Sequence, residues 1–133
     1  MMNIKIFTFI FILSLSFLFS QEKPNTVIKS KQLSENKVYQ LFPTKNFWTF
    51  IKLNTRNGKM WQVHFGITET DARVTLDLNK FPLVSEEKEV NGRFTLYPSE
   101  NTFNFLLLDQ IDGNVYQVQW SVEESNRLVI PIQ

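Results

Sequence analysis

Cysteine is absent from this chain of 133 residues. No disulfide is therefore available to brace the fold, and lipid attachment to an N-terminal cysteine is excluded. A small domain without disulfides depends on its apolar core for stability. We therefore expect a single domain that is held together by packing alone.

Histidine is nearly absent as well, because His64 is the only one. A serine or cysteine nucleophile normally needs a base such as histidine beside it, and zinc sites draw on histidine and cysteine. The sequence therefore predicts no catalytic residue, no metal site and no cofactor. One enzymatic alternative stays open, a small hydrolase that uses only carboxylates, drawn from Glu69, Glu124 and Asp71.

An excess of charge of either sign is also lacking, with 14 Lys and Arg against 13 Asp and Glu. Nucleic-acid-binding domains present a strongly basic face. We therefore expect no nucleic-acid partner.

The N-terminus has the layout of a signal peptide. Lys5 precedes an apolar run from Ile6 to Phe19, which is shorter than the roughly 20 residues of a membrane-spanning helix. Small residues suitable for cleavage are Ser16, near the end of this run, and Ser20, directly after it, and we favour Ser20. The sequence thus predicts a signal peptide over 1–20, an exported protein in the periplasm or outside the cell, and no stable membrane span after cleavage. An uncleaved membrane anchor is the alternative.

The rest of the chain contains an internal repeat. Residues 36–71 align without a gap onto residues 91–126, and a repeat of this length usually marks one supersecondary unit that stacks on its copy. The identical pairs are Asn36/Asn91, Leu41/Leu96, Pro43/Pro98, Asn46/Asn101, Phe50/Phe105, Leu53/Leu108, Gly58/Gly113, Gln62/Gln117, Val63/Val118 and Glu69/Glu124. Residues 21–35 are polar and are expected to form an N-terminal arm or linker before a single β domain over 36–133.

Each repeat is expected to form four strands. Asn57-Gly58 and Asp112-Gly113 lie between segments rich in aromatic and β-branched residues, which favours a hairpin with a two-residue type I′ turn in both copies. The expected strands are 37–42, 47–54, 59–67, 73–78, 93–97, 102–109, 114–122 and 127–132. The fold class is therefore all-β, an eight-stranded antiparallel sandwich or small barrel built from tandem repeats at about 36–78 and 91–132.

Alternation along the strands separates an aromatic-rich face from a face with amides. We expect the aromatic-rich face to form the core in both copies, with Phe50 opposite Phe65 and Phe105 opposite Trp120. This face comprises Trp61, Val63, Phe65, Ile67, Tyr116, Val118, Trp120 and Val122. The other face carries the candidate binding residues Gln62, His64, Gln117 and Gln119 beside several leucines. A structural role for the two matched glutamines, bridging strands or capping backbone groups, is the alternative.

The segments 43–46 and 98–101 form a second matched pair. Proline followed by hydroxyl and asparagine side chains is typical of a turn. A pair of ligand-contacting loops is the alternative interpretation.

Together these patterns favour an exported, non-catalytic binding or envelope-assembly module with a protein or glycan partner. Exposed faces of mixed apolar and amide character are typical of interfaces. The alternatives are the carboxylate-dependent hydrolase and a structural subunit that dimerises through a sheet face. The pattern is compatible with an oligomer.

Overall fold

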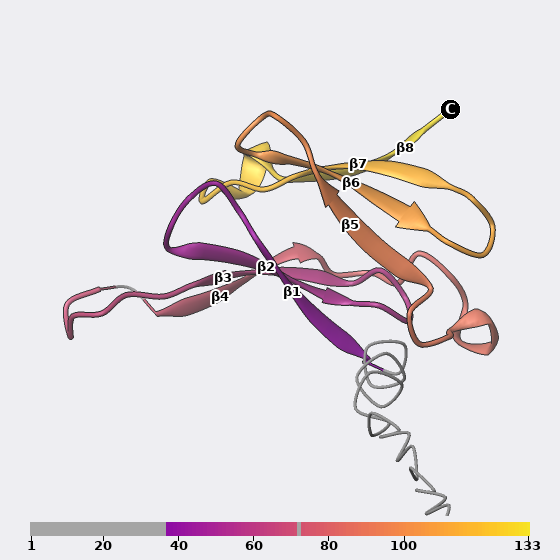
Figure 1. Ribbon diagram of the computed structural model, residues 1–133, viewed down its shortest axis with the longest axis horizontal. Helices are drawn as coiled ribbons and strands as arrows, with labels where there is room; N and C mark the ends of the chain where they lie inside the picture. Colours follow the sequence, from indigo (N-terminus) through magenta and orange to yellow (C-terminus); the bar gives the residue numbers. More distant parts are fainter. Residues whose placement is uncertain (1–36, 72) are drawn as a thin grey trace, which may run out of the picture.

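The computed structural model describes residues 37–71 and 73–133. These residues form two four-stranded antiparallel sheets that pack against each other and do not close into a barrel (Figure 1). The predicted all-β fold is confirmed, and of its two forms the sandwich is the one observed. The predicted signal peptide and N-terminal arm lie outside the described residues.

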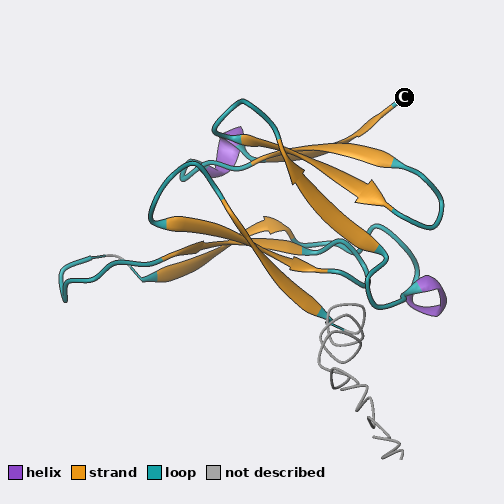
Figure 2. Cartoon of the chain, in the orientation of Figure 1, coloured by secondary structure: helices purple, strands orange, loops and turns teal. Residues whose placement is uncertain are grey.

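Both sheets are meanders in which consecutive strands pair. The first contains β1 (Tyr39–Pro43), β2 (Thr49–Asn54), β3 (Met60–His64) and β4 (Val74–Asn79); the second contains β5 (Phe94–Pro98), β6 (Asn104–Asp109), β7 (Val115–Gln119) and β8 (Leu128–Ile132). Short 3₁₀ helices, η1 (Glu86–Lys88) and η2 (Glu124–Asn126), lie in the connections (Figure 2). The shared strand order and register agree with the repeat in the sequence.

The hairpin turns are longer than expected. The Asn54 amide donates to the carbonyl of Lys59 (2.8 Å), which leaves four residues in the loop. A type I′ turn requires positive φ at both central residues, but only the glycine has it: φ is 77° at Gly58 and 74° at its counterpart Gly113, and no other residue type among those described has a positive φ. The predicted turn position is right, and the predicted turn type is wrong.

The longer loop shifts the strand pairing by two residues. Phe50 lies opposite Val63 and not Phe65, and Phe105 lies opposite Val118 and not Trp120. A shift of two residues keeps every side chain on its original face. The alternation along the strands is therefore preserved.

The sheets pack front to back: the side of the first sheet that faces the interior corresponds, in the repeat, to the side of the second sheet that faces outward. In the second sheet the expected core face is confirmed, because Phe105, Val118 and Trp120 are buried. In the first sheet the expectation is wrong: Ile51 is fully buried, whereas Phe65 is 37% exposed. The core consists of Ile51, Leu53, Met60, Leu78, Phe94, Leu96, Phe105, Leu107, Val118 and Trp120.

This stacking explains the error. Ile51 corresponds to Leu106 in the second repeat, and Ile51 is covered while Leu106 is 42% exposed. The two sheets have the same orientation in the stack, so the side of the first sheet that is covered corresponds to the side of the second sheet that is open. Equivalent positions therefore have opposite environments. The alternation of side chains along a strand assigns residues to two faces. It does not tell which face is covered when both faces are apolar.

A buried ion pair fixes the start of β5. The guanidinium of Arg93 donates to both carboxylate oxygens of Asp109 (3.0 and 2.7 Å) and to Asp112 (2.5 Å). Burial alone would raise the pKa of Asp109, but hydrogen bonds from Arg93 and from two backbone amides together hold it below its usual value. Such a pair is strongly destabilising to break on one side, since it leaves a buried charge without a partner.

Candidate functional site

The four predicted binding residues do not share one surface. Gln62 is completely buried between the sheets, where its Nε2 donates to the carbonyl of Ser121 (2.9 Å). Gln117, its counterpart, is half-buried on the outer face of the second sheet, paired with Leu106 and Ile130. Front-to-back stacking therefore separates the matched glutamines. It gives Gln62 the internal hydrogen-bonding role that the sequence offered as the alternative.

His64 and Gln119 occupy equivalent places at the ends of β3 and β7. His64 Nδ1 lies 3.0 Å from the hydroxyl of Thr49, while its Nε2 is buried and has no hydrogen-bond partner within residues 37–71 and 73–133. Burial, and to a smaller extent the charge of Arg127, lowers the pKa of His64 below the usual 6.5. The ring is therefore neutral at pH 7 and serves as a hydrogen-bonding group, as the amide of Gln119 does.

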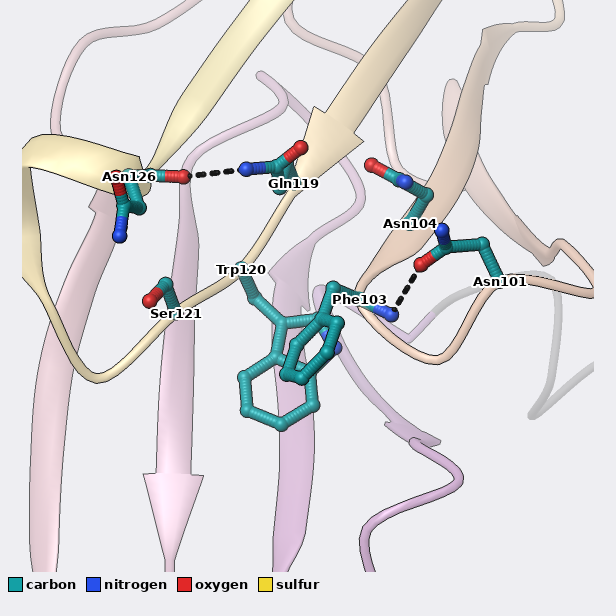
Figure 3. A pocket seen from close by; sticks show the side chains of 7 residues that line it. All are labelled: Asn101, Phe103, Asn104, Gln119, Trp120, Ser121 and Asn126. Atoms are coloured by element: carbon teal, nitrogen blue, oxygen red, sulfur yellow. Dashed lines mark hydrogen bonds between the residues drawn. The ribbon is translucent and has the colours of Figure 1, made fainter.

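A pocket of about 270 Å³ opens beside Gln119 (Figure 3). The rings of Phe103 and Trp120 lie together in it, with centroids 5.2 Å apart. Around them are amide side chains, and the Oδ1 atom of Asn104 is buried without a hydrogen-bond partner among the described residues. The lining consists of Asn101, Phe103, Asn104, Gln119, Trp120, Ser121 and Asn126.

The first repeat carries the equivalent pocket, with a volume of about 390 Å³. Every lining residue of the smaller pocket has its counterpart here. These are Asn46, Trp48, Thr49, His64, Phe65, Gly66 and Asp71, joined by Val74, Leu76 and Val122. The repeat therefore builds the same aromatic and polar pocket twice.

Sequence reasoning missed most of these residues, although a signal was present. Asn46 and Asn101 end the matched segments 43–46 and 98–101, and both line a pocket. They also make the turns expected there: the Asn46 carboxamide oxygen accepts from the Trp48 amide, and that of Asn101 from the Phe103 amide, both at 2.9 Å. The turn interpretation of these segments is confirmed, and ligand contact stays a prediction.

Of the three carboxylates of the hydrolase alternative, one lines either of these pockets. Asp71 lines the larger pocket, whereas Glu69 and Glu124 line neither of these pockets. A hydrogen bond from the backbone of Thr68 lowers the pKa of Asp71, and Glu124 is paired with Lys80 at 3.7 Å. Within residues 37–71 and 73–133, no three His, Asp or Glu side chains are grouped as metal ligands. The carboxylate-dependent hydrolase therefore stays a prediction in which only Asp71 lies at one of these pockets.

The outer side of the first sheet presents what we call the aromatic face: Tyr39, Leu41, Phe50, Lys52, Trp61, Val63 and Phe65. Its rings form contacts along the sheet, with centroids 6.3 Å apart for Tyr39 and Trp61 and 5.9 Å apart for Phe50 and Phe65. The Nζ atom of Lys52 lies 4.5 Å from the Trp61 centroid. Lys52 is the one cation in this set.

The outer side of the second sheet presents the aliphatic face: Thr95, Tyr97, Leu106, Leu108, Val115, Gln117, Ile130 and Ile132. None of these residues is charged. Tyr97, Ile130 and Ile132 are about half exposed, at 51%, 48% and 51%. Both open sides of the sandwich thus show apolar side chains on neighbouring strands, interrupted by Lys52 on the first sheet and Gln117 on the second.

Searches against models of known protein families, curated proteins and solved structures give no match for this chain. Within the described residues, no helix has the length and apolar character needed to cross a membrane.

Proposed function

We propose that this protein is an exported, non-catalytic β module that binds another protein through the outer faces of its two sheets. The aliphatic face carries the proposal, because Tyr97, Leu106, Ile130 and Ile132 project from it and are between 42% and 51% exposed. Monomeric proteins rarely leave contiguous apolar patches in water unless the patch binds something. A neutral, mixed apolar and amide surface matches the core of a protein interface.

Export agrees with this role. The apolar run at 6–19 supports secretion to the periplasm or the cell exterior, where envelope assembly takes place. A chain without cysteine forms no disulfides under the oxidising conditions there.

Photo-crosslinking in the producing cell tests the proposal. A photoreactive phenylalanine analogue is placed at Leu41 on the aromatic face or at Leu106 on the aliphatic face, with Glu86 in η1 as an exposed control. We expect protein adducts from the two face positions in clear excess over the control. Equal yields at all three positions would show that the faces bind no protein.

A glycan at the paired pockets is the second candidate. The observation in its favour is the combination of two rings in contact, Phe103 tilted against Trp120, and the buried Oδ1 of Asn104, which has no hydrogen-bond partner among the described residues. Aromatic surface with a few placed polar groups is typical of small-ligand sites. Titration with soluble oligosaccharides, followed by tryptophan fluorescence, should show saturation that Phe103→Ala removes; no saturable change in the parent protein would exclude this site.

A further inference from the structure

The internal interface and the two outer faces are built from the same pair of surfaces. Inside the sandwich, one side of the first sheet, here called surface A, meets the opposite side of the second sheet, surface B. Surface A of the second sheet and surface B of the first sheet are the ones left open. Each open surface of the molecule therefore has an equivalent in the other repeat, and that equivalent surface is buried in the internal interface.

Strand register makes the correspondence of surface A explicit. In the first sheet this row is Phe42, Ile51, Gln62 and Leu76. Ile51 and Gln62 are buried, and Phe42 packs against the core. The matching row in the second sheet is Tyr97, Leu106, Gln117 and Ile130, in the aliphatic face. Three of these four have apolar side chains in both copies, and the fourth is glutamine in both.

Surface B corresponds in the same way. In the second sheet it contributes Leu96, Phe105, Leu107, Tyr116 and Val118 to the interior or its border. The matching residues of the first sheet are Leu41, Phe50, Lys52, Trp61 and Val63, in the aromatic face. Two positions of surface B change to a charged side chain: Lys52 stands in place of Leu107, and Asp77, opposite Trp61, stands in place of Pro131.

We propose that the aliphatic face of one molecule docks on the aromatic face of a second copy of this chain, repeating the internal interface between molecules. The inference rests on the proposed function, since it names the protein that occupies the faces. Such a contact joins two different surfaces and is heterologous. Four-stranded sheets stacked this way close into rings at about four to eight units, or about two to four copies; without closure the contact extends as a filament.

One polar contact in the interior predicts a matching contact between molecules. The carbonyl of Ser121 accepts from Gln62 Nε2 (2.9 Å) and from Arg127 Nε (2.8 Å). Gly66, the counterpart of Ser121, accepts from Arg73 Nε at 3.4 Å. Gln117 makes no side-chain hydrogen bond within residues 37–71 and 73–133, and a docked second copy brings it to the Gly66 carbonyl.

Lys52 sets the strength of the contact. Its ammonium lies over Trp61 and must give up water when the face is covered, which opposes docking. Its position corresponds to Leu107 in the interior. Association is therefore weaker than the internal packing and depends on concentration, and Lys52→Leu should tighten it by about tenfold.

Mixing of two blocked variants tests the geometry. Leu41→Lys charges the aromatic face and Leu106→Lys charges the aliphatic face, both at exposed positions. By gel filtration with light scattering, the parent protein should form oligomers as concentration rises, and each variant alone should stay monomeric. A mixture should give a one-to-one dimer that grows no further, because each partner retains one competent face.

Three results would overturn the inference: a parent protein that stays monomeric at its highest soluble concentration, a blocked variant that still forms dimers alone, or no complex in the mixture. Lys52→Leu is a variant that should strengthen association, so its result does not depend on a destabilised fold. Unchanged association of the Lys52→Leu variant also contradicts the proposal. Failure here stays distinct from failure of the proposed function. Photo-adducts from Leu106 to a different protein, with none to a second copy, agree with the proposed function and contradict self-assembly. No adducts at all contradict both proposals.

Discussion

Gln62 and Gln117 occupy the same position in two copies of one repeat, yet the first is completely buried and the second faces outward. Gln62 donates to the backbone of Ser121 across the sandwich. The contrast follows from the way the sheets stack, front against back. It makes the two glutamines a matched pair in which only the environment differs.

This pair gives the first prediction. Gln62→Ala removes a buried hydrogen bond and should lower the free energy of unfolding by about 1–3 kcal/mol. Gln117→Ala lies on the outer face and should change it by less than about 0.5 kcal/mol. Urea denaturation of the two variants measures the difference, and similar losses from both would contradict the front-to-back arrangement.

A second matched pair separates the aromatic residues. Trp120 is 3% exposed and Phe65, its counterpart, is 37% exposed. Trp120→Ala should cost about 3–5 kcal/mol, the usual range for emptying a buried aromatic site. Phe65→Ala should cost clearly less, because much of its ring already contacts water. Denaturant melts that rank Phe65→Ala as the more damaging change would reverse the assignment of faces.

These pairs also show how far the sequence alone reaches. Gly58 and Gly113 located both hairpins, because only glycine adopts the positive φ at that point without strain. The loop length did not follow from those residues, since a four-residue loop with one left-handed glycine uses the same Asn-Gly or Asp-Gly pair. Alternation placed Trp61 and Gln62 on opposite faces correctly but gave no basis for choosing which face is covered.

The candidate site was predicted only in part. His64 and Gln119 do line pockets, and the asparagines at 46 and 101 were noted as turn residues. Trp48 and Phe103 were not identified, because their role depends on how the loop after β1 or β5 folds back beside the end of β3 or β7. This proximity arises from the tertiary structure, and no local sequence pattern indicates it.

The Arg93–Asp109 pair predicts loss of stability in acid. The pKa of Asp109 is lowered in the folded protein, so its ion pair stabilises the fold above the unfolded value of about 3.9 and is lost as pH falls through the lower folded value. Asp109→Asn should destabilise the fold at neutral pH, by less than the about 3–5 kcal/mol of a buried charge left without any partner, because Asp112 still contacts Arg93. Urea melts from pH 7 down to pH 3 measure both effects; an acid-insensitive parent protein would refute them.

His64 predicts a separate effect at higher pH. Its pKa is lowered in the folded state, so the unfolded chain binds the proton first and stability declines as pH falls below about 6.5. His64→Gln, which introduces the residue found at position 119, should remove this decline and leave the acid loss from Asp109 intact. Nuclear magnetic resonance titration of the imidazole gives the folded pKa directly, and a value above 6.5 would contradict the sign.

The exported form should lack the first 20 residues. The apolar run at 6–19 followed by Ser20 motivates this expectation. Mass spectrometry of protein recovered from outside the cytoplasm gives the answer, and an intact Met1 in that fraction would show that the segment is retained.

Thiol labelling tests the central arrangement most directly, because the chain has no cysteine of its own. Ile51→Cys and Leu106→Cys place one thiol each at equivalent positions of the two repeats. Front-to-back stacking with an open aliphatic face predicts that the thiol at position 106 reacts quickly in dilute solution and becomes protected as the protein associates, while the thiol at position 51 stays protected throughout. Equal labelling rates at the two positions in dilute solution would contradict the account.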